Sequence, residues 1–166
     1  MKKIALGFSI ILAFMPLTTL ALTSEQEAVI SGECDTIRET LKMIQRADSK
    51  VRTHLGAYYE NILNKFMKPL NNRLVETNIP SNELINAQVN LKNAKDKFSE
   101  DFILYQRILG DELIQIDCRN NPKGFYDKLV EVRQARAVVR DDVQKTNALI
   151  YEYRNSVTRM MESLND

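Results

Sequence analysis

An unbroken helical repeat over residues 123–164 constrains the fold of this chain more than any other feature of its sequence. Positions of the repeat return at alternating steps of three and four, a spacing that places them in one stripe along an α-helix. Only Arg136 and Thr146 interrupt the stripe with polar side chains. The pattern predicts one long helix that presents this stripe to partner helices, as in a coiled coil. The positions are Phe125, Leu129, Val132, Arg136, Val139, Val143, Thr146, Ile150, Tyr153, Val157, Met160 and Leu164.

Two earlier segments show helical spacing as well, and breaks that contain Pro80 and Pro122 separate the three segments. With only 5 Gly and 4 Pro, the chain has too few turn residues for a fold of many short strands. Short connections make successive helices antiparallel. We therefore expect an all-α fold, an elongated antiparallel three-helix bundle (up-down-up) that forms one domain over residues 35–166. The expected helices span about 35–75, 82–117 and 123–164.

The N-terminal 21 residues have the composition of an export signal. Lys2 and Lys3 precede an apolar run, and Thr19 and Ala21 provide the small residues that a signal peptidase recognises. We expect residues 1–21 to be a cleaved signal peptide and residues 22–34 to be a short lead-in to the bundle. An uncleaved signal anchor over residues 4–22 is the alternative. Both interpretations predict an extracytoplasmic protein, in the periplasm, at the cell surface, secreted or anchored in the inner membrane.

The two cysteines, Cys34 and Cys118, test the antiparallel arrangement. Cys34 precedes the first predicted helix and Cys118 ends the second, so a hairpin that turns midway between them brings the two side by side. Cysteines of exported proteins usually pair, because that compartment is oxidising. We predict an intrachain disulfide; unpaired thiols or a bond between chains are the alternatives.

Two polar residues interrupt the hydrophobic stripes of the first and third predicted helices. If Phe125 lies level with Ile37, Asp48 lies level with Arg136, and the hairpin brings Tyr105 of the second helix close to both. We predict a buried polar layer of Asp48, Arg136 and Tyr105 that fixes the register of the helices, because a slipped register would leave a charge unpaired. Alternatively, both charged side chains leave the stripe and end in water.

Apolar residues beyond the stripes gather near the predicted hairpin tip. They are the best candidates for a partner surface, unless a wide bundle buries them at positions that flank the stripes. Arg133, Arg136 and Arg140 follow one helix face and suggest a small anion site, but neighbouring acids favour a structural role. The candidate partner residues are Tyr59, Leu63, Met67, Ile85, Val89 and Tyr151.

The sequence contains no set of residues that indicates catalysis. His54 is the only histidine, which argues against a di-iron or zinc site, and nucleotide-binding glycine loops are absent. Without Lys2 and Lys3 the chain has 21 basic against 22 acidic residues, a balance that gives no reason to bind nucleic acid. We expect a protein that is not an enzyme and has no cofactor or metal.

The expected function is that of an exported scaffold or interaction protein, which acts by self-association or by binding an envelope or surface protein. A signal-anchored subunit with the bundle as a rigid spacer is the alternative. A remote alternative is a small-ligand carrier or an enzyme, and a deep pocket with converging polar groups would favour this alternative.

Overall fold

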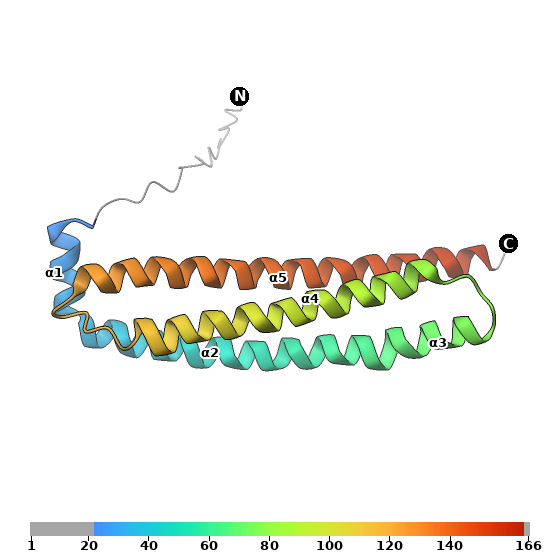
Figure 1. Ribbon diagram of the computed structural model, residues 1–166, viewed down its shortest axis with the longest axis horizontal. Helices are drawn as coiled ribbons and strands as arrows, with labels where there is room; N and C mark the ends of the chain where they lie inside the picture. Colours follow the sequence, from blue (N-terminus) through green and yellow to red (C-terminus); the bar gives the residue numbers. More distant parts are fainter. Residues whose placement is uncertain (1–21, 165–166) are drawn as a thin grey trace, which may run out of the picture.

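The computed structural model describes residues 22–164, and every regular element in this range is helical, as predicted. The expected signal peptide (residues 1–21) lies outside the described residues, as does nearly all of the alternative anchor (residues 4–22). Figure 1 shows long helical segments side by side, with a short helix across one end. The elements are α1 (Ser24–Gly32), α2 (Cys34–Asn61), the π-helical segment η1 (Ile62–Met67), α3 (Lys68–Glu76), α4 (Asn82–Arg107), the π-helical segment η2 (Ile108–Leu113) and α5 (Pro122–Ser163).

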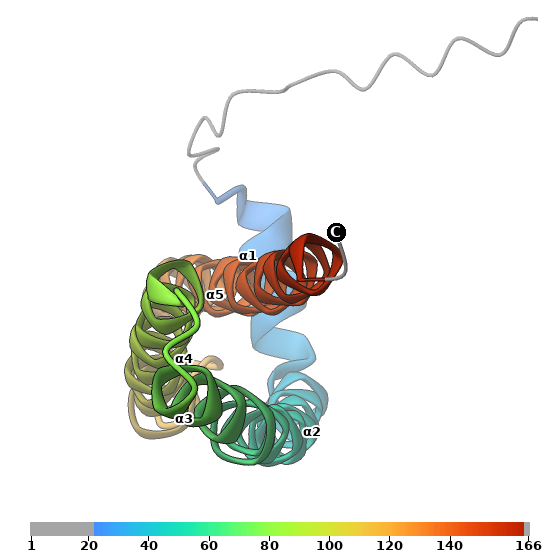
Figure 2. The ribbon, with the colours of Figure 1, turned by 90° about the vertical axis from the view of Figure 1, so that its right-hand side faces the viewer.

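The first rod contains α2, η1 and α3, the second contains α4 and η2, and α5 alone forms the third. In the view along the rods, α4 lies between α2 and α5 (Figure 2). Helix α5 packs along the whole of α4, whereas α2 diverges from α5 on the open side of the molecule. This arrangement leaves room between α2 and α5 at mid-length.

The turn between α3 and α4 follows from the residues at the end of α3. Asn78 adopts a left-handed conformation with φ 54°, which Asn tolerates better than most residues. Its N–H donates to the carbonyl of Val75, and the N–H of Ile79 donates to that of Leu74 at 2.9 Å. This pair of bonds is a Schellman motif, which closes the helix and reverses the chain.

The predicted first helix is not regular, because the π-helical segment η1 interrupts it just before Pro69. Proline has no N–H, and its ring clashes with the carbonyl four residues earlier in an α-helix. In the wider turn the N–H of Lys68 instead donates to the carbonyl of Leu63. Pro69 then occupies the first turn of α3, where its missing donor costs little. The rod therefore passes the proline instead of ending there.

The other helix boundaries differ modestly from the prediction. The second rod ends at Leu113 and not at residue 117, and its last turns form η2. Part of the predicted lead-in (residues 22–34) is the helix α1, which Thr23 and Gln26 cap reciprocally. Helix α5 begins at Pro122, and the Asn121 side chain accepts a hydrogen bond from the N–H of Gly124 at 3.0 Å.

A chain of aromatic rings forms the centre of the core. Tyr59, Phe98, Phe102 and Tyr105 follow one another with ring centroids 5.9, 6.1 and 5.7 Å apart. Tyr59 comes from α2 and the other three from one face of α4, so the rings join the first two rods at mid-length. Such edge-to-face and tilted contacts are the geometries that aromatic pairs prefer.

The buried amide of Asn71 joins all three rods near the hairpin tip. Its Nδ2 donates to the carbonyl of Leu84 at 3.2 Å and to Oε1 of Gln88 at 2.7 Å, and its Oδ1 accepts from the Tyr153 hydroxyl at 3.0 Å. These partners satisfy the buried polar atoms of Asn71, so the layer fixes how α3, α4 and α5 align.

Candidate binding groove between α2 and α5

The bond between Cys34 and Cys118 joins the first two rods at one end of the molecule. Cys34 is the first residue of α2, Cys118 follows η2, and their Cα atoms lie 5.5 Å apart. Both side chains are buried. The predicted pairing is confirmed, and with it the antiparallel course of the first two rods. A nearby ion pair, Arg119 with Asp35 at 2.8 Å, joins the same two chain segments at the surface.

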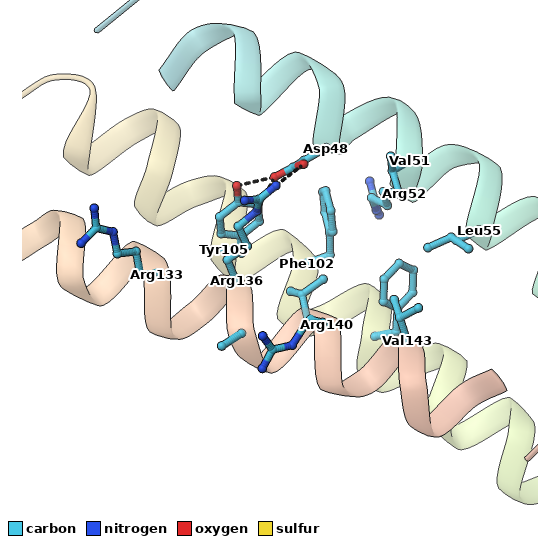
Figure 3. Close-up of a pocket in the computed structure, with 13 residues that line it drawn as sticks. Asp48, Val51, Arg52, Leu55, Phe102, Tyr105, Arg133, Arg136, Arg140 and Val143 are labelled. Atoms are coloured by element: carbon cyan, nitrogen blue, oxygen red, sulfur yellow. Dashed lines mark hydrogen bonds and ion pairs between the residues drawn. The ribbon is translucent and has the colours of Figure 1, made fainter. Parts of the chain in front are cut away.

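The three residues of the predicted polar layer meet at mid-length (Figure 3). Arg136 donates to Asp48 twice, from Nε to Oδ2 at 3.0 Å and from Nη2 to Oδ1 at 2.9 Å. The Tyr105 hydroxyl donates to Oδ2 of Asp48 at 2.6 Å. Burial, and next the hydrogen bond to the Asp48 carboxylate, raise the pKa of Tyr105. Each rod thus contributes one side chain to a single cluster.

The cluster is only partly buried, which corrects the prediction for Arg136: Tyr105 is buried, as predicted. The Asp48 side chain is 16% exposed, but that of Arg136 is 56% exposed. The physical reason is the distance between the outer rods. Because α4 separates α2 from α5, their stripes face a space that is open to solvent, and Arg136 extends across this space to reach Asp48. The pair therefore bridges the mouth of a groove.

A double-mutant cycle tests whether this bridge stabilises the fold. We expect Asp48→Leu alone to cost more than the combined Asp48→Leu and Arg136→Leu change, because the single variant leaves a cation without its partner. The expected coupling energy is about 1 kcal/mol, since one partner is largely exposed. Urea unfolding of the four proteins measures it. Strictly additive losses would contradict a functional pairing.

The groove has a volume of about 510 Å³ and an aromatic floor. Phe98, Phe102 and Tyr105 of α4 form the floor. Apolar side chains form much of the walls: Val51 and Leu55 from α2, and Ala137, Val139 and Val143 from α5. Figure 3 shows these side chains around the space between the helices.

Four arginines surround the same groove: Arg52 on α2, and Arg133, Arg136 and Arg140 on α5. Arg52 lies over the ring of Phe102, with its guanidinium carbon 5.6 Å from the centroid, and so makes a cation–π contact. Arg140 contacts the exposed carboxylate of Asp141 at 3.2 Å. The sequence had suggested a small anion site at the three arginines of α5, and the structure places all three at the groove.

The groove is short, because neighbouring contacts limit it at both ends. Toward the hairpin tip the Tyr59 hydroxyl donates to Oδ1 of Asn147 at 3.4 Å, which joins α2 to α5. Toward the disulfide end, α1 packs against α5 near Leu129 and Arg133. The lining residues of α5 run from Arg133 to Val143, which corresponds to roughly 15 Å of helix.

The residues of the predicted partner surface do not form a surface patch. Tyr59, Leu63 and Met67 are buried in the core, and Ile85 is half-buried. Only Val89 and Tyr151 are exposed, at 51% and 63%.

The physical reason for this correction is the π-helical segment. Residues four apart drift steadily around an α-helix, but the wider turn of η1 lets Tyr59, Leu63 and Met67 keep facing the other rods. Phe66 points outward instead, and so does Tyr58, which the heptad pattern had placed inside.

A second charged feature lies between α4 and α5, where the carboxyl groups of Asp101 and Asp142 are within hydrogen-bond reach. Burial, and next the contact with Asp101, raise the pKa of Asp142 from 3.8 to about 6. Lys97, 2.6 Å from Asp101, lowers the pKa of that carboxyl group. Asp142 thus keeps its proton up to about pH 6.

This pair predicts a stability change between about pH 4 and pH 6. In that window unfolded Asp142 has lost its proton while the folded group keeps it, so the contribution of Asp142 to stability falls as the pH rises and stays low above pH 6. We expect Asp142→Asn to stabilise the protein by about 1 kcal/mol at pH 7 and to have no effect near pH 4. Thermal unfolding across this range checks it; a benefit that is equal at both pH values would contradict it.

Other kinds of site receive no support from the part of the chain that is described. Within residues 22–164, no three His, Cys, Asp or Glu side chains gather as metal ligands, and His54 is exposed. No helix in this range is both long and apolar enough to cross a membrane.

The sequence did not reveal the groove. The alignment that sets Phe125 level with Ile37 also sets Val51 level with Val139 and Leu55 level with Val143, and such contacts would have filled the space. No sequence signal distinguishes two stripes in contact from two stripes that line an opening. Comparison of the chain with known protein families, curated proteins and solved structures finds no match.

Proposed function

We propose that this protein is an extracytoplasmic, non-enzymatic binding protein and that the groove between α2 and α5 is its binding site. The observation that carries the proposal is an opening of about 510 Å³ with an apolar floor and a rim of arginines. This volume lies within the range of small-molecule sites, which are mostly apolar with a few placed polar groups. The rods act as an elongated three-helix scaffold that holds the two walls apart.

The chemistry of the lining favours holding a ligand over converting it. Its one carboxylate, Asp48, is already bound by Arg136 and Tyr105, so it is not free to act as a base. Arginine stays protonated in proteins and therefore binds anions but does not transfer protons.

The export interpretation supplies the compartment. The signal-like composition of residues 1–21 and the Cys34–Cys118 pair both fit an oxidising environment outside the cytoplasm. N-terminal sequencing of the exported protein separates the two forms of the proposal: a start near Leu22 supports a free protein, and an intact N-terminus supports a membrane-anchored subunit.

Nile red, a neutral dye that fluoresces in apolar sites, tests the binding role. We expect its emission to rise and shift to the blue with the wild-type protein. Ala137→Trp fills the groove and should abolish the signal, whereas Ile103→Trp, on the exposed outer face of α4, should leave it unchanged. Equal signals from both variants, or none from the wild type, would refute the groove as a binding site.

A second candidate function, contact with a protein partner or a second copy, is favoured by exposed apolar residues on the first rod. Met43, Tyr58 and Phe66 of this rod are between 47% and 63% exposed, and none of them lines the groove. Sedimentation of the wild type and of Phe66→Glu, with Leu104→Glu on α4 as the control, tests self-association. Crosslinking from position 66 tests a different partner. Monomers without crosslinks would exclude this candidate.

A further inference from the structure

The distribution of charge around the groove identifies the class of its ligand, if the groove binds as proposed above. We propose that it takes a single-chain amphiphile with an anionic head, whose head lies among Arg133, Arg136 and Arg140 and whose hydrocarbon chain covers the floor at Phe98 and Phe102.

Positive charge is concentrated at the groove and only partly balanced there. Four arginines line it against one carboxylate, that of Asp48, and Asp141 adds only one more at the outer edge. The whole chain, by contrast, has a formal net charge of only +1. Arg133, Arg136 and Arg140 follow one face of α5 at steps of three and four, a spacing at which like charges repel. An anion between them would relieve that repulsion.

Donors of these arginines remain available for such an anion. Among residues 22–164, Arg133 forms no ion pair, Arg52 donates from Nη2 to Oγ of Ser99 at 3.4 Å, and Arg136 uses only Nε and Nη2 to hold Asp48. Guanidinium groups present several N–H donors in a planar fork that matches carboxylates and phosphates. The half-exposed Arg136 between its two neighbours is therefore the natural position for the head.

The remaining lining is suited to a hydrocarbon chain. Leu55 and Val143 extend the apolar surface beyond Arg136 toward the hairpin tip (Figure 3), and Phe98 adds to the floor. An alkyl chain along this surface would remove it from water without leaving any polar group unpaired. The lining thus has a charged rim and an apolar floor, so the head of an amphiphile can lie at the rim while its chain covers the floor.

The length of the groove favours a small molecule over a helix of another protein. It extends for roughly 15 Å, and both the Tyr59–Asn147 contact and α1 limit it. A docked helix is about 10–12 Å wide and needs to pass beyond such limits to bury several turns. A medium-length alkyl chain with one head group does not.

Displacement of Nile red by three probes of equal chain length tests the charge of the ligand. Decanoate, decanol and decyltrimethylammonium differ in the head alone, and each is used below its aggregation concentration. We expect decanoate to displace the dye at a concentration about tenfold lower than the cationic probe, with decanol between them. Equal displacement by all three would overturn the anionic assignment and leave the binding role intact. Absence of any Nile red signal would instead overturn the binding role itself.

Charge variants locate the head group. Arg133→Gln combined with Arg140→Gln should weaken the binding of decanoate about tenfold and leave the binding of decanol unchanged. The matched control, Lys123→Gln combined with Arg154→Gln, removes two exposed charges of α5 outside the groove and should change neither. If the control weakens decanoate as much as the groove variant does, general attraction explains the preference and the proposed head site is wrong. The three-probe comparison on the wild type stands even if a variant folds poorly.

Discussion

Replacing Cys34 and Cys118 with serine is expected to lower the free energy of unfolding by about 2–5 kcal/mol. The bond joins residues 84 positions apart, so it removes a large closed loop from the freedom of the unfolded chain. It also joins the start of α2 to the segment after η2, at the end of the molecule where α1 crosses. Urea unfolding of the oxidised wild type and of the double variant measures the loss.

The same experiment contains its own control. A reducing agent should destabilise the wild type to about the level of the double serine variant, and it should not change the variant. If reduction leaves the wild type as stable as before, the bond does not stabilise the fold. If reduction also weakens the variant, the reagent acts on something other than this bond.

Replacing Tyr59 with alanine should cost about 3–5 kcal/mol, whereas the same change at its neighbour Tyr58 should cost less than about 1 kcal/mol. Tyr59 is fully buried and contacts Phe98 edge to face, with ring centroids 5.9 Å apart. Tyr58 points outward. Two adjacent tyrosines thus differ only in the direction in which the rod presents them, which makes them a matched pair. Thermal and urea unfolding measure both.

This comparison also decides between two registers of the first rod. The heptad pattern of the sequence places Tyr58 inside, and the structure places Tyr59 there. A larger loss at Tyr58 would contradict the structural register. The variant Tyr59→Phe separates the contribution of ring packing from that of the hydroxyl hydrogen bond. Because the contact with Asn147 is long, at 3.4 Å, this variant should lose about 1 kcal/mol of stability or less.

Much of the fold could be predicted from the sequence, because local patterns carry the information. The periodicity from Phe125 to Leu164 defines α5 almost to the residue, and Pro80 and Pro122 accompany the two reversals. The pairing of Cys34 with Cys118 follows from their symmetrical places around the hairpin. The contact of Asp48 with Arg136 follows from level-by-level alignment of two stripes.

The candidate site could be predicted only in part. Arg133, Arg136 and Arg140 were recognisable as a cationic row, and Asp48 and Tyr105 as partners of one of them. Arg52 and the aromatic floor could not be recognised as parts of a site. Aromatic residues at helical spacing indicate a hydrophobic core, not a binding groove. The proposed tip surface was wrong for a related reason, since spacing alone cannot show which of two neighbouring stripes faces inward.

The sequence by itself determined that the chain forms long amphipathic helices, where they reverse and which cysteines meet. These properties depend on neighbours along one helix or on chain length, which the residue order states directly. Only the tertiary structure decided how far apart α2 and α5 lie, because that distance depends on how both pack against α4. It also decided which side of the first rod is buried, because the π-helical segment before Pro69 changes the direction in which the neighbouring side chains point. The groove results from the first of these two decisions, and the loss of the predicted tip surface from the second.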